Sequence, residues 1–328
     1  MKGLNLISLT LFSCLSFALF GQESQSFIVM DVAGLVNCVE YPGADQCDLV
    51  IGQTLGMEAV VSMTSGSTVR LLYGGQSISL KEAGNYPLKS LVTKRPEKST
   101  TFFKRFFNYV YEGIVNTSGP KQIEKYHELY LTQSSGGIKG FAGADYGISV
   151  TQPVMGNIIP SPLQFEWFSA GDSILYDFQI LDYQTDGLIF KALLRDTSAV
   201  VHLEQLAIEP GRKYYWMVQQ KRLGETTIDF SLADDPYMRS PKVEFVVSGQ
   251  EVSALTRTVE TSEEYREAEG SDQLLMRAHA LEEAGYPSMA NEVLRNAMSI
   301  EPSNLLLRRV YAAFLIRQGL WDAAQLFL

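Results

Sequence analysis

The sequence predicts a multidomain α+β protein in which two β domains precede a helical C-terminal region. The first ninety residues contain short apolar runs separated by glycines, the pattern of a small β domain with tight hairpins. Residues 160–248 alternate apolar and polar side chains around tryptophans, which is typical of a β-sandwich. The last sixty residues return small side chains at a period of 34, which predicts stacked helical hairpins.

The chain begins with a leader-like segment, residues 1–21. Lys2 is followed by an apolar run from Leu4 to Phe20 and then by Gly21, the layout of a secretory signal peptide. We therefore expect export to the periplasm or cell surface of a Gram-negative-type envelope. A retained membrane anchor or a lipid anchor at Cys14 is the alternative. No later run approaches ~18 apolar residues, so we expect no transmembrane span after cleavage.

Residues 22–95 are expected to form the first β domain. Its order of motifs is Val32, Gly34 and Val36, then Gly-Gln-Thr-Leu at 52–55, then Ser-Thr-Val-Arg-Leu at 67–71. In this order the motifs resemble the periplasmic domain of FecR-type regulators. The resemblance implies a module that receives a signal from an outer-membrane receptor, which a transmembrane helix relays to a cytoplasmic anti-sigma segment. We recognise neither relay part, so we expect only the β module to be shared.

Cleavage of the leader leaves two cysteines, Cys38 and Cys47, within this domain. The residues between them include Tyr41-Pro42-Gly43-Ala44-Asp45, which predicts a turn that brings the two together. An oxidising destination then favours a disulfide that closes a small loop. Two buried free thiols are the alternative. A metal site is disfavoured because no histidine lies nearby to complete a tetrahedral shell.

Residues 96–150 are expected to hold one amphipathic helix and linkers. Aromatic and aliphatic side chains recur at helical spacing from Phe102 to Ile114, with Lys104 and Glu112 on the opposite face. The simplest interpretation is a helix packed against the N-terminal sheet, and an in-plane membrane helix is the alternative. Polar, Gly- and Ser-rich composition predicts linkers at 116–125 and 133–147.

Residues 151–250 are expected to form the second β domain. An early strand ends on Trp167, and a later Pro-Gly turn leads into Tyr214-x-Trp216-x-Val218. This arrangement resembles a fibronectin type III or immunoglobulin-like sandwich. The resemblance implies that Trp167 lies in the core and that Tyr214 is the corner tyrosine. Stacking of these aromatics on a sugar is the alternative function.

Residues 251–328 are expected to be helical, beginning with an acidic segment. Ala278, Leu281, Gly285 and Ala290 return 34 positions later as Ala312, Leu315, Gly319 and Ala324. The 34-residue period and the small residues at these positions resemble tetratricopeptide repeats, in which a glycine supplies each tight inter-helix turn. A pair of helical hairpins that only caps the preceding domain is the alternative.

Tetratricopeptide repeats usually dock peptides or proteins, so the resemblance implies a partner-binding surface on these helices. The candidate partner-binding side chains are Arg277, Leu281, Arg308, Leu315, Leu326 and Phe327. Two repeats bury little surface. The apolar C-terminal edge is therefore expected to be covered by the acidic helix, by a partner or by a second copy of the chain.

Composition and motifs argue against catalysis and against nucleic-acid binding. The formal net charge is -10, and the three histidines lie in different predicted modules. We find no nucleophile motif and no clustered metal ligands, so we expect no catalytic site, cofactor or metal. The resulting hypothesis is a non-enzymatic, exported adaptor whose two β modules hold the helical pairs at a distance. A FecR-type periplasmic signalling accessory and a carbohydrate- or peptidoglycan-binding protein are the alternatives.

Overall fold

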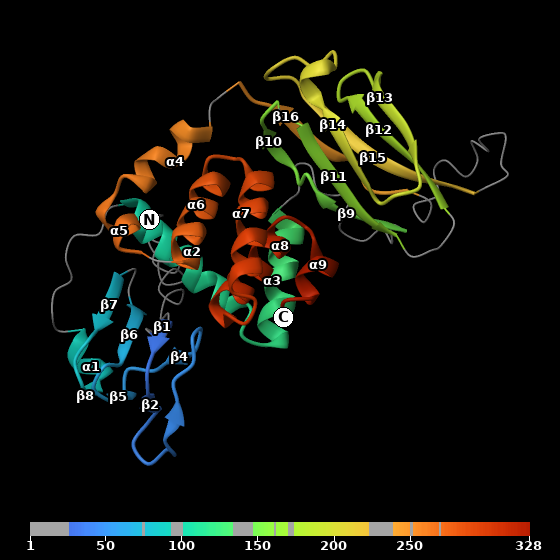
Figure 1. Cartoon of the computed structure of the whole chain (residues 1–328). Helices are drawn as coiled ribbons and strands as arrows, with labels where there is room; N and C mark the ends of the chain where they lie inside the picture. The colour runs from blue at the N-terminus through green and yellow to red at the C-terminus, as the bar shows by residue number, and fades with distance from the viewer. Residues whose placement is uncertain are drawn as a thin grey trace, which may run out of the picture. The chain divides into compact units, whose positions relative to one another are not determined.

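The computed structural model describes residues 26–73, 76–92, 101–133, 147–160, 162–169, 174–222, 239–249, 252–268 and 270–328 (Figure 1). The chain divides into two compact units, residues 1–107 and residues 108–328, and the division falls inside helix α2 (Thr101–Asn116). Strands are the main regular elements of the first unit, and the second unit contains both strands and helices. The predicted α+β class is therefore confirmed. The leader lies outside the described residues.

The first unit contains two four-stranded sheets. One sheet has the order β4-β1-β6-β7, from β1 (Phe27–Ala33), β4 (Thr54–Leu55), β6 (Thr68–Tyr73) and β7 (Gln76–Leu80). The other has the order β3-β2-β5-β8, from β2 (Val36–Val39), β3 (Cys47–Asp48), β5 (Val60–Met63) and β8 (Gly84–Pro87), which helix α1 (Leu88–Leu91) follows. Alternate residues of both sheets, such as Phe27 and Val61, fill one common core, so the strand prediction for this region holds.

The second unit contains a sandwich of two sheets. The larger sheet has the order β10-β16-β15-β12-β13, from β10 (Gly156–Ile158), β12 (Ile174–Asp182), β13 (Leu188–Leu194), β15 (Lys213–Arg222) and β16 (Val243–Val247). The smaller has the order β14-β11-β9, from β9 (Ile148–Gln152), β11 (Pro162–Ser169) and β14 (Ser198–His202), which a short 3-10 helix (Leu203–Gln205) follows. Inward-facing side chains of both sheets share one core.

Aromatic side chains dominate this core. Trp167 and Trp216 are each no more than 1% exposed, and the ring of Phe178 packs against both. The hydroxyl of Tyr214 accepts a hydrogen bond of 2.8 Å from the backbone N–H of Glu209, which is the geometry of a corner tyrosine. The predicted roles of Trp167 and Tyr214 are both confirmed.

Six helices follow the sandwich. They are α4 (Val252–Glu260), α5 (Glu263–Glu267), α6 (Ser271–Glu283), α7 (Pro287–Ile300), α8 (Leu305–Arg317) and α9 (Trp321–Gln325). Gly285 and Gly319 adopt positive φ angles of 82° and 75° at the α6–α7 and α8–α9 turns, as the repeat predicted. The small repeated residues, such as Ala278 and Ala312, are buried where the helices approach. Within the described part of the chain, no helix is long and apolar enough to span a membrane.

Helix α3 (Pro120–Gln133) was not predicted. Part of it falls on residues 116–125, which we expected to be a linker because of their polar composition. Pro120 stands in the first turn of the helix, where the missing N–H costs nothing, and the polar side chains that suggested a linker are mostly exposed. Tyr126 supplies a buried face. An amphipathic helix with few apolar positions was therefore mistaken for a connection.

The sandwich and the first helical pair are in direct contact. At the α6–α7 turn the carbonyl of Gly285 accepts a 2.9 Å hydrogen bond from the N–H of Asn157, and Ser288 Oγ donates to the carbonyl of Val154 at 3.0 Å. A Cβ on Gly156 would lie 2.6 Å from the ring of Pro287, so the strand and the helix meet closely. We expected the helical pairs to be held at a distance from the β modules, but the sandwich adjoins them instead.

Candidate functional site

The inner surface of the helical pairs is occupied by the chain's own helices. On α2, the Tyr109 ring lies 4.7 Å from that of His279 on α6. A Cβ on Gly113 would lie 3.2 Å from the Cα of Val310, so a glycine lets α2 approach α8 closely. Together these contacts place α2 across α6 and α8. The second half of α2, from Asn108 on, therefore packs against α6 and α8, and the expected packing of its Phe-rich first half against the N-terminal sheet stays a prediction.

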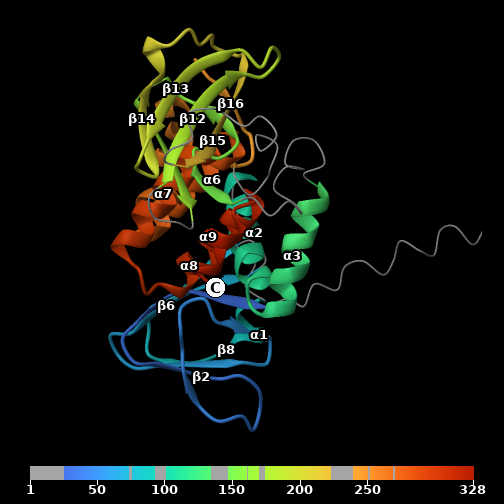
Figure 2. The ribbon, with the colours of Figure 1, turned by 90° about the vertical axis from the view of Figure 1, so that its right-hand side faces the viewer.

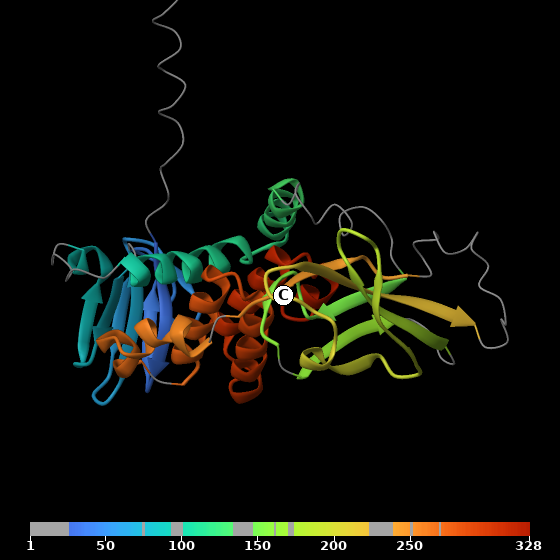
Figure 3. The ribbon, with the colours of Figure 1, turned by 90° about the horizontal axis from the view of Figure 1, so that it is seen from above.

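Helix α3 lies along α8 at the far side of the helical layer. The Tyr126 hydroxyl accepts a 3.2 Å hydrogen bond from Arg317, and the rings of His127 and Trp321 stack at 4.1 Å. Figure 2 and Figure 3 show α3, in green, beside the red C-terminal helices from two directions. A segment that precedes the sandwich in the sequence therefore packs against α8 and the start of α9.

A buried ion pair joins these helices. Arg317 on α8 makes two hydrogen bonds to the carboxylate of Glu282 on α6, of 2.9 and 2.8 Å, and its guanidinium lies 4.6 Å from the centre of the Tyr109 ring. Burial opposes the charge of Arg317, but the carboxylate of Glu282 holds its pKa above the usual value. Burial and the same carboxylate raise the pKa of Tyr109. Arg317 therefore stays charged and Tyr109 stays protonated at neutral pH.

The six predicted partner-binding residues divide by exposure. Leu281 and Leu315 are buried in the helical layer, so neither offers a surface. Arg277 pairs with Glu260 at 3.1 Å, and Phe327 packs on the Tyr311 ring at 4.8 Å.

Arg308 and Leu326 complete the set. Arg308 is half-buried, and Leu326 is 71% exposed at the C-terminal end of the layer. The structure therefore does not bring the six residues together in one exposed patch.

The sandwich presents a second surface, at its edge strands β13 and β14. Among the described residues the only sheet neighbour of β13 is β12, and that of β14 is β11. Leu188 and Leu193 on β13 are 57% and 54% exposed, and Val200 on β14 is 64% exposed. Consecutive edge strands with exposed aliphatic side chains can add a further strand through their free backbone groups.

Lys191, at the middle of β13, carries the charge nearest this edge. Its ammonium lies 2.9 Å from the carboxylate of Asp177 on β12, and Lys221 of β15 lies 3.5 Å from the same carboxylate. Asp177 is buried, while the side chain of Lys191 is 41% exposed. Two cations thus face one carboxylate of the larger sheet, and Lys191 is the more exposed of the two.

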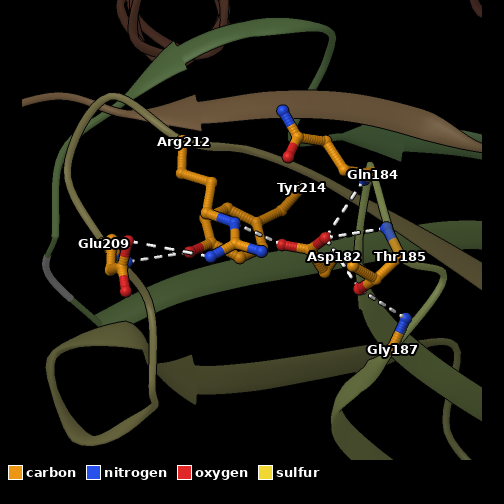
Figure 4. A network of polar contacts seen from close by, with 7 residues as sticks. All are labelled: Asp182, Gln184, Thr185, Gly187, Glu209, Arg212 and Tyr214. Carbon is orange, nitrogen blue, oxygen red and sulfur yellow. Dashed lines mark hydrogen bonds and ion pairs between the residues drawn. The ribbon is translucent and has the colours of Figure 1, made fainter.

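The hairpin that starts β13 is held by a polar network (Figure 4). Asp182 Oδ1 accepts hydrogen bonds from the backbone N–H groups of Gln184 and Thr185 and from the Thr185 hydroxyl, at 2.8–3.1 Å. Asp182 Oδ2 pairs with Arg212 Nε at 2.5 Å. The Arg212 hydrogen bond, followed by those from Thr185, lowers the pKa of Asp182 to about 2. The Asp182 carboxylate is therefore ionised at neutral pH, and its hydrogen bonds fix the turn from β12 into β13.

The Asp182 carboxylate is already engaged by the hairpin and by Arg212. We find no group of three or more His, Cys, Asp or Glu in the described part of the chain that could hold a metal ion. The buried carboxylates Asp177 and Asp182 and the largely buried Glu282 each face a cation, so their charge has a structural explanation. Trp167 and Trp216 are buried and cannot stack on a sugar in this structure.

No protein-family model matches the sequence, and no curated protein is significantly similar to it. The resemblances to FecR-type, fibronectin type III or immunoglobulin-like, and tetratricopeptide domains therefore stay expectations drawn from residue patterns.

Sequence reasoning missed the two networks and the exposed edge. Arg317 had one usable signal, since it is a cation in the last turn of α8 and directly follows the apolar run from Val310 to Ile316. The edge strand had no such signal, because strand order within a sheet depends on pairing between segments that are not adjacent in the sequence.

Proposed function

We propose that the protein is a non-enzymatic adaptor of the cell envelope that binds a partner protein. The observation that carries this proposal is the edge strand of the larger sheet, β13, with its exposed leucines Leu188 and Leu193. We call these two residues the sandwich edge. Export rests on the leader-like residues 1–21, which lie outside the described residues.

Docking through the helical pairs, as the repeat pattern suggested, is less favoured than docking through the sandwich edge. A peptide on the inner surface of α6 and α8 would have to displace α2, whose Val110 and Ile114 side chains are buried. Removing that cover would expose several large apolar side chains, at about 1.5–3 kcal/mol each. In this proposal the helical layer serves as the frame on which the sandwich is mounted.

The occupant of the sandwich edge is an extended segment of a different protein. Two β13 strands paired antiparallel about their centre would set Lys191 of one copy against Lys191 of the other, and like charges directly opposite destabilise a sheet. A segment with an acidic residue between apolar ones would instead meet Lys191 with its carboxylate and the two leucines with its apolar side chains. Charge and shape therefore favour a heterologous acidic strand.

The test uses short extended peptides and the purified chain. Peptides with an acidic centre between apolar residues should bind, and replacement of the acidic residue by lysine should weaken binding about tenfold, the factor that corresponds to ~1.4 kcal/mol. Leu193→Glu should abolish binding, whereas Leu326→Glu, at an equally exposed leucine outside the edge, should not. Lys191→Glu should transfer the preference to the lysine-centred peptides.

A photo-crosslinking amino acid at position 193 or 326 extends the test to envelope extracts. A discrete adduct from position 193 that disappears in a Leu188→Glu background would support docking at the edge. An adduct that forms only from position 326, or peptide binding that ignores Leu193→Glu and Lys191→Glu, would reject the edge as the docking site.

A further inference from the structure

Cys38 and Cys47 meet across a strand pair in the first unit. Cys38 lies on β2 and Cys47 on β3, and the antiparallel register sets the two residues directly opposite each other. Both side chains are thiols in this structure, and their Sγ atoms lie 2.6 Å apart. The turn between them therefore does what the sequence predicted and brings the two sulfurs within bonding reach, while the disulfide itself stays a prediction.

The two thiols differ in access. Cys38 is 0% exposed and belongs to the core shared by the two sheets, whereas Cys47 is half-buried at the edge of that core. Gln53 Nε2 lies 3.6 Å from Cys38 Sγ and also donates to the Glu40 carboxylate at 3.2 Å, so a polar side chain lies against the buried sulfur. An oxidant in solution can therefore reach Cys47 but not Cys38.

The high pKa of Cys38 also disfavours it as the first thiol to react. Burial, and next the neighbouring Cys47, raise the pKa of Cys38 to about 12, so its thiolate is scarce at neutral pH. Because the thiolate is the nucleophile in disulfide exchange, Cys38 is a poor first attacker on an external disulfide.

We propose that Cys47 is the entry thiol and Cys38 the resolving thiol of an intramolecular disulfide formed by exchange with an external disulfide. The Cys47 thiolate attacks one sulfur of the oxidant's disulfide, forms a mixed disulfide and releases one oxidant thiolate. Cys38, after losing its proton, then attacks Cys47 Sγ, forms the Cys38–Cys47 bond and releases the second oxidant thiolate. The oxidant gains the two electrons that the cysteines lose, and the two protons pass to the released thiolates.

The oxidant is a small or protein disulfide, such as glutathione disulfide or an oxidoreductase with a reactive disulfide. The product would close the segment from Val39 to Gln46, whose Tyr41 is exposed. The hairpin would then be fixed at its base by a covalent bond as well as by the β2–β3 hydrogen bonds.

The test uses residues 22–328, from which Cys14 is absent, reduced and then freed of reductant. Treated with glutathione disulfide under native conditions, the Cys38→Ser variant should accumulate an adduct of one glutathione, and Cys47→Ser should react about tenfold or more slowly. The unsubstituted chain should lose both free thiols without a stable adduct. Intact-mass spectrometry and thiol titration measure each outcome.

Two controls keep the proposal open to refutation. In denaturant both variants should form the adduct at similar rates, which shows that the native difference comes from burial. Cys38→Ala, which places no hydroxyl in the core, repeats the measurement if Cys38→Ser fails to fold by circular dichroism. Equal or reversed native rates, or an unsubstituted chain that keeps two titratable thiols, would overturn the proposal.

Discussion

The sandwich and the helical layer each contain an arginine–carboxylate pair, but the two pairs join very different parts of the chain. Asp182 ends β12 and Arg212 precedes β15, and these two strands are neighbours. Arg317 joins α8 to Glu282 on α6 and also to Tyr126 on α3, which lies 191 residues earlier. The pair in the sandwich thus joins neighbouring strands, whereas the pair in the helical layer also contacts a segment that the whole sandwich separates from it in the sequence.

The largest expected effect tests the helical side of this comparison. Arg317→Leu leaves the Glu282 carboxylate buried without its cation, so we expect a loss of about 3–5 kcal/mol in the free energy of unfolding of the second unit. Urea titration followed by circular dichroism measures it. Arg308→Leu, at a half-buried arginine of the same helix outside this ion pair, is the matched control, and an equal loss in both variants would mean that the pair has no special role.

A smaller effect is expected at the crossing of α2 and α8. Gly113→Leu keeps a good helix former but places a side chain where the Val310 Cα already limits the space, so we expect a destabilisation of about 1–3 kcal/mol. Asn108→Leu, at an exposed position of α2, should change stability by less than about 0.5 kcal/mol. If both variants change the free energy of unfolding by the same amount, the close approach of α2 and α8 does not contribute to stability.

The sandwich pair gives a prediction in pH. Because the pKa of Asp182 is lower in the folded chain than in the unfolded chain, its pair with Arg212 stabilises the fold above about pH 4, and that contribution is lost as the pH falls toward 2. Asp182→Asn should therefore lower the melting temperature at pH 7 and lose this deficit in acid. A deficit that stays constant down to pH 2, or one that the exposed Asp196→Asn reproduces, would contradict the assignment.

The smallest effect is expected at the corner tyrosine. Tyr214→Phe removes one hydrogen bond to the Glu209 N–H and should cost about 1 kcal/mol, without changing the slope of the urea transition. Tyr183→Phe, at a partly exposed tyrosine of the same domain, should be nearly neutral. If Tyr214→Phe destabilised the protein as much as Arg317→Leu, the contacts within the sandwich and those between distant helices would contribute alike, which contradicts the comparison.

The same contrast decides what the sequence could predict. Trp167, Tyr214, Gly285 and Gly319 were assigned correctly because alternation, turn composition and the repeat period are properties of neighbouring residues. The contacts of α2 and α3 with α8 were not predicted, because their partners Val310 and Arg317 lie far along the chain and no local sequence pattern indicates them. Cys38 and Cys47 lie between these cases, because a short turn brought them together but their bond depends on the redox environment.

The separation between α3 and α8 has a consequence for synthesis. The aromatic face of α2 and the Tyr126 side of α3 emerge from the ribosome well before the helix that covers them, with the entire sandwich still to be made. A nascent chain arrested before α8 would therefore carry exposed aromatic surface, a target for holdase chaperones and a route to aggregation. That surface is covered only after α8 has been synthesised.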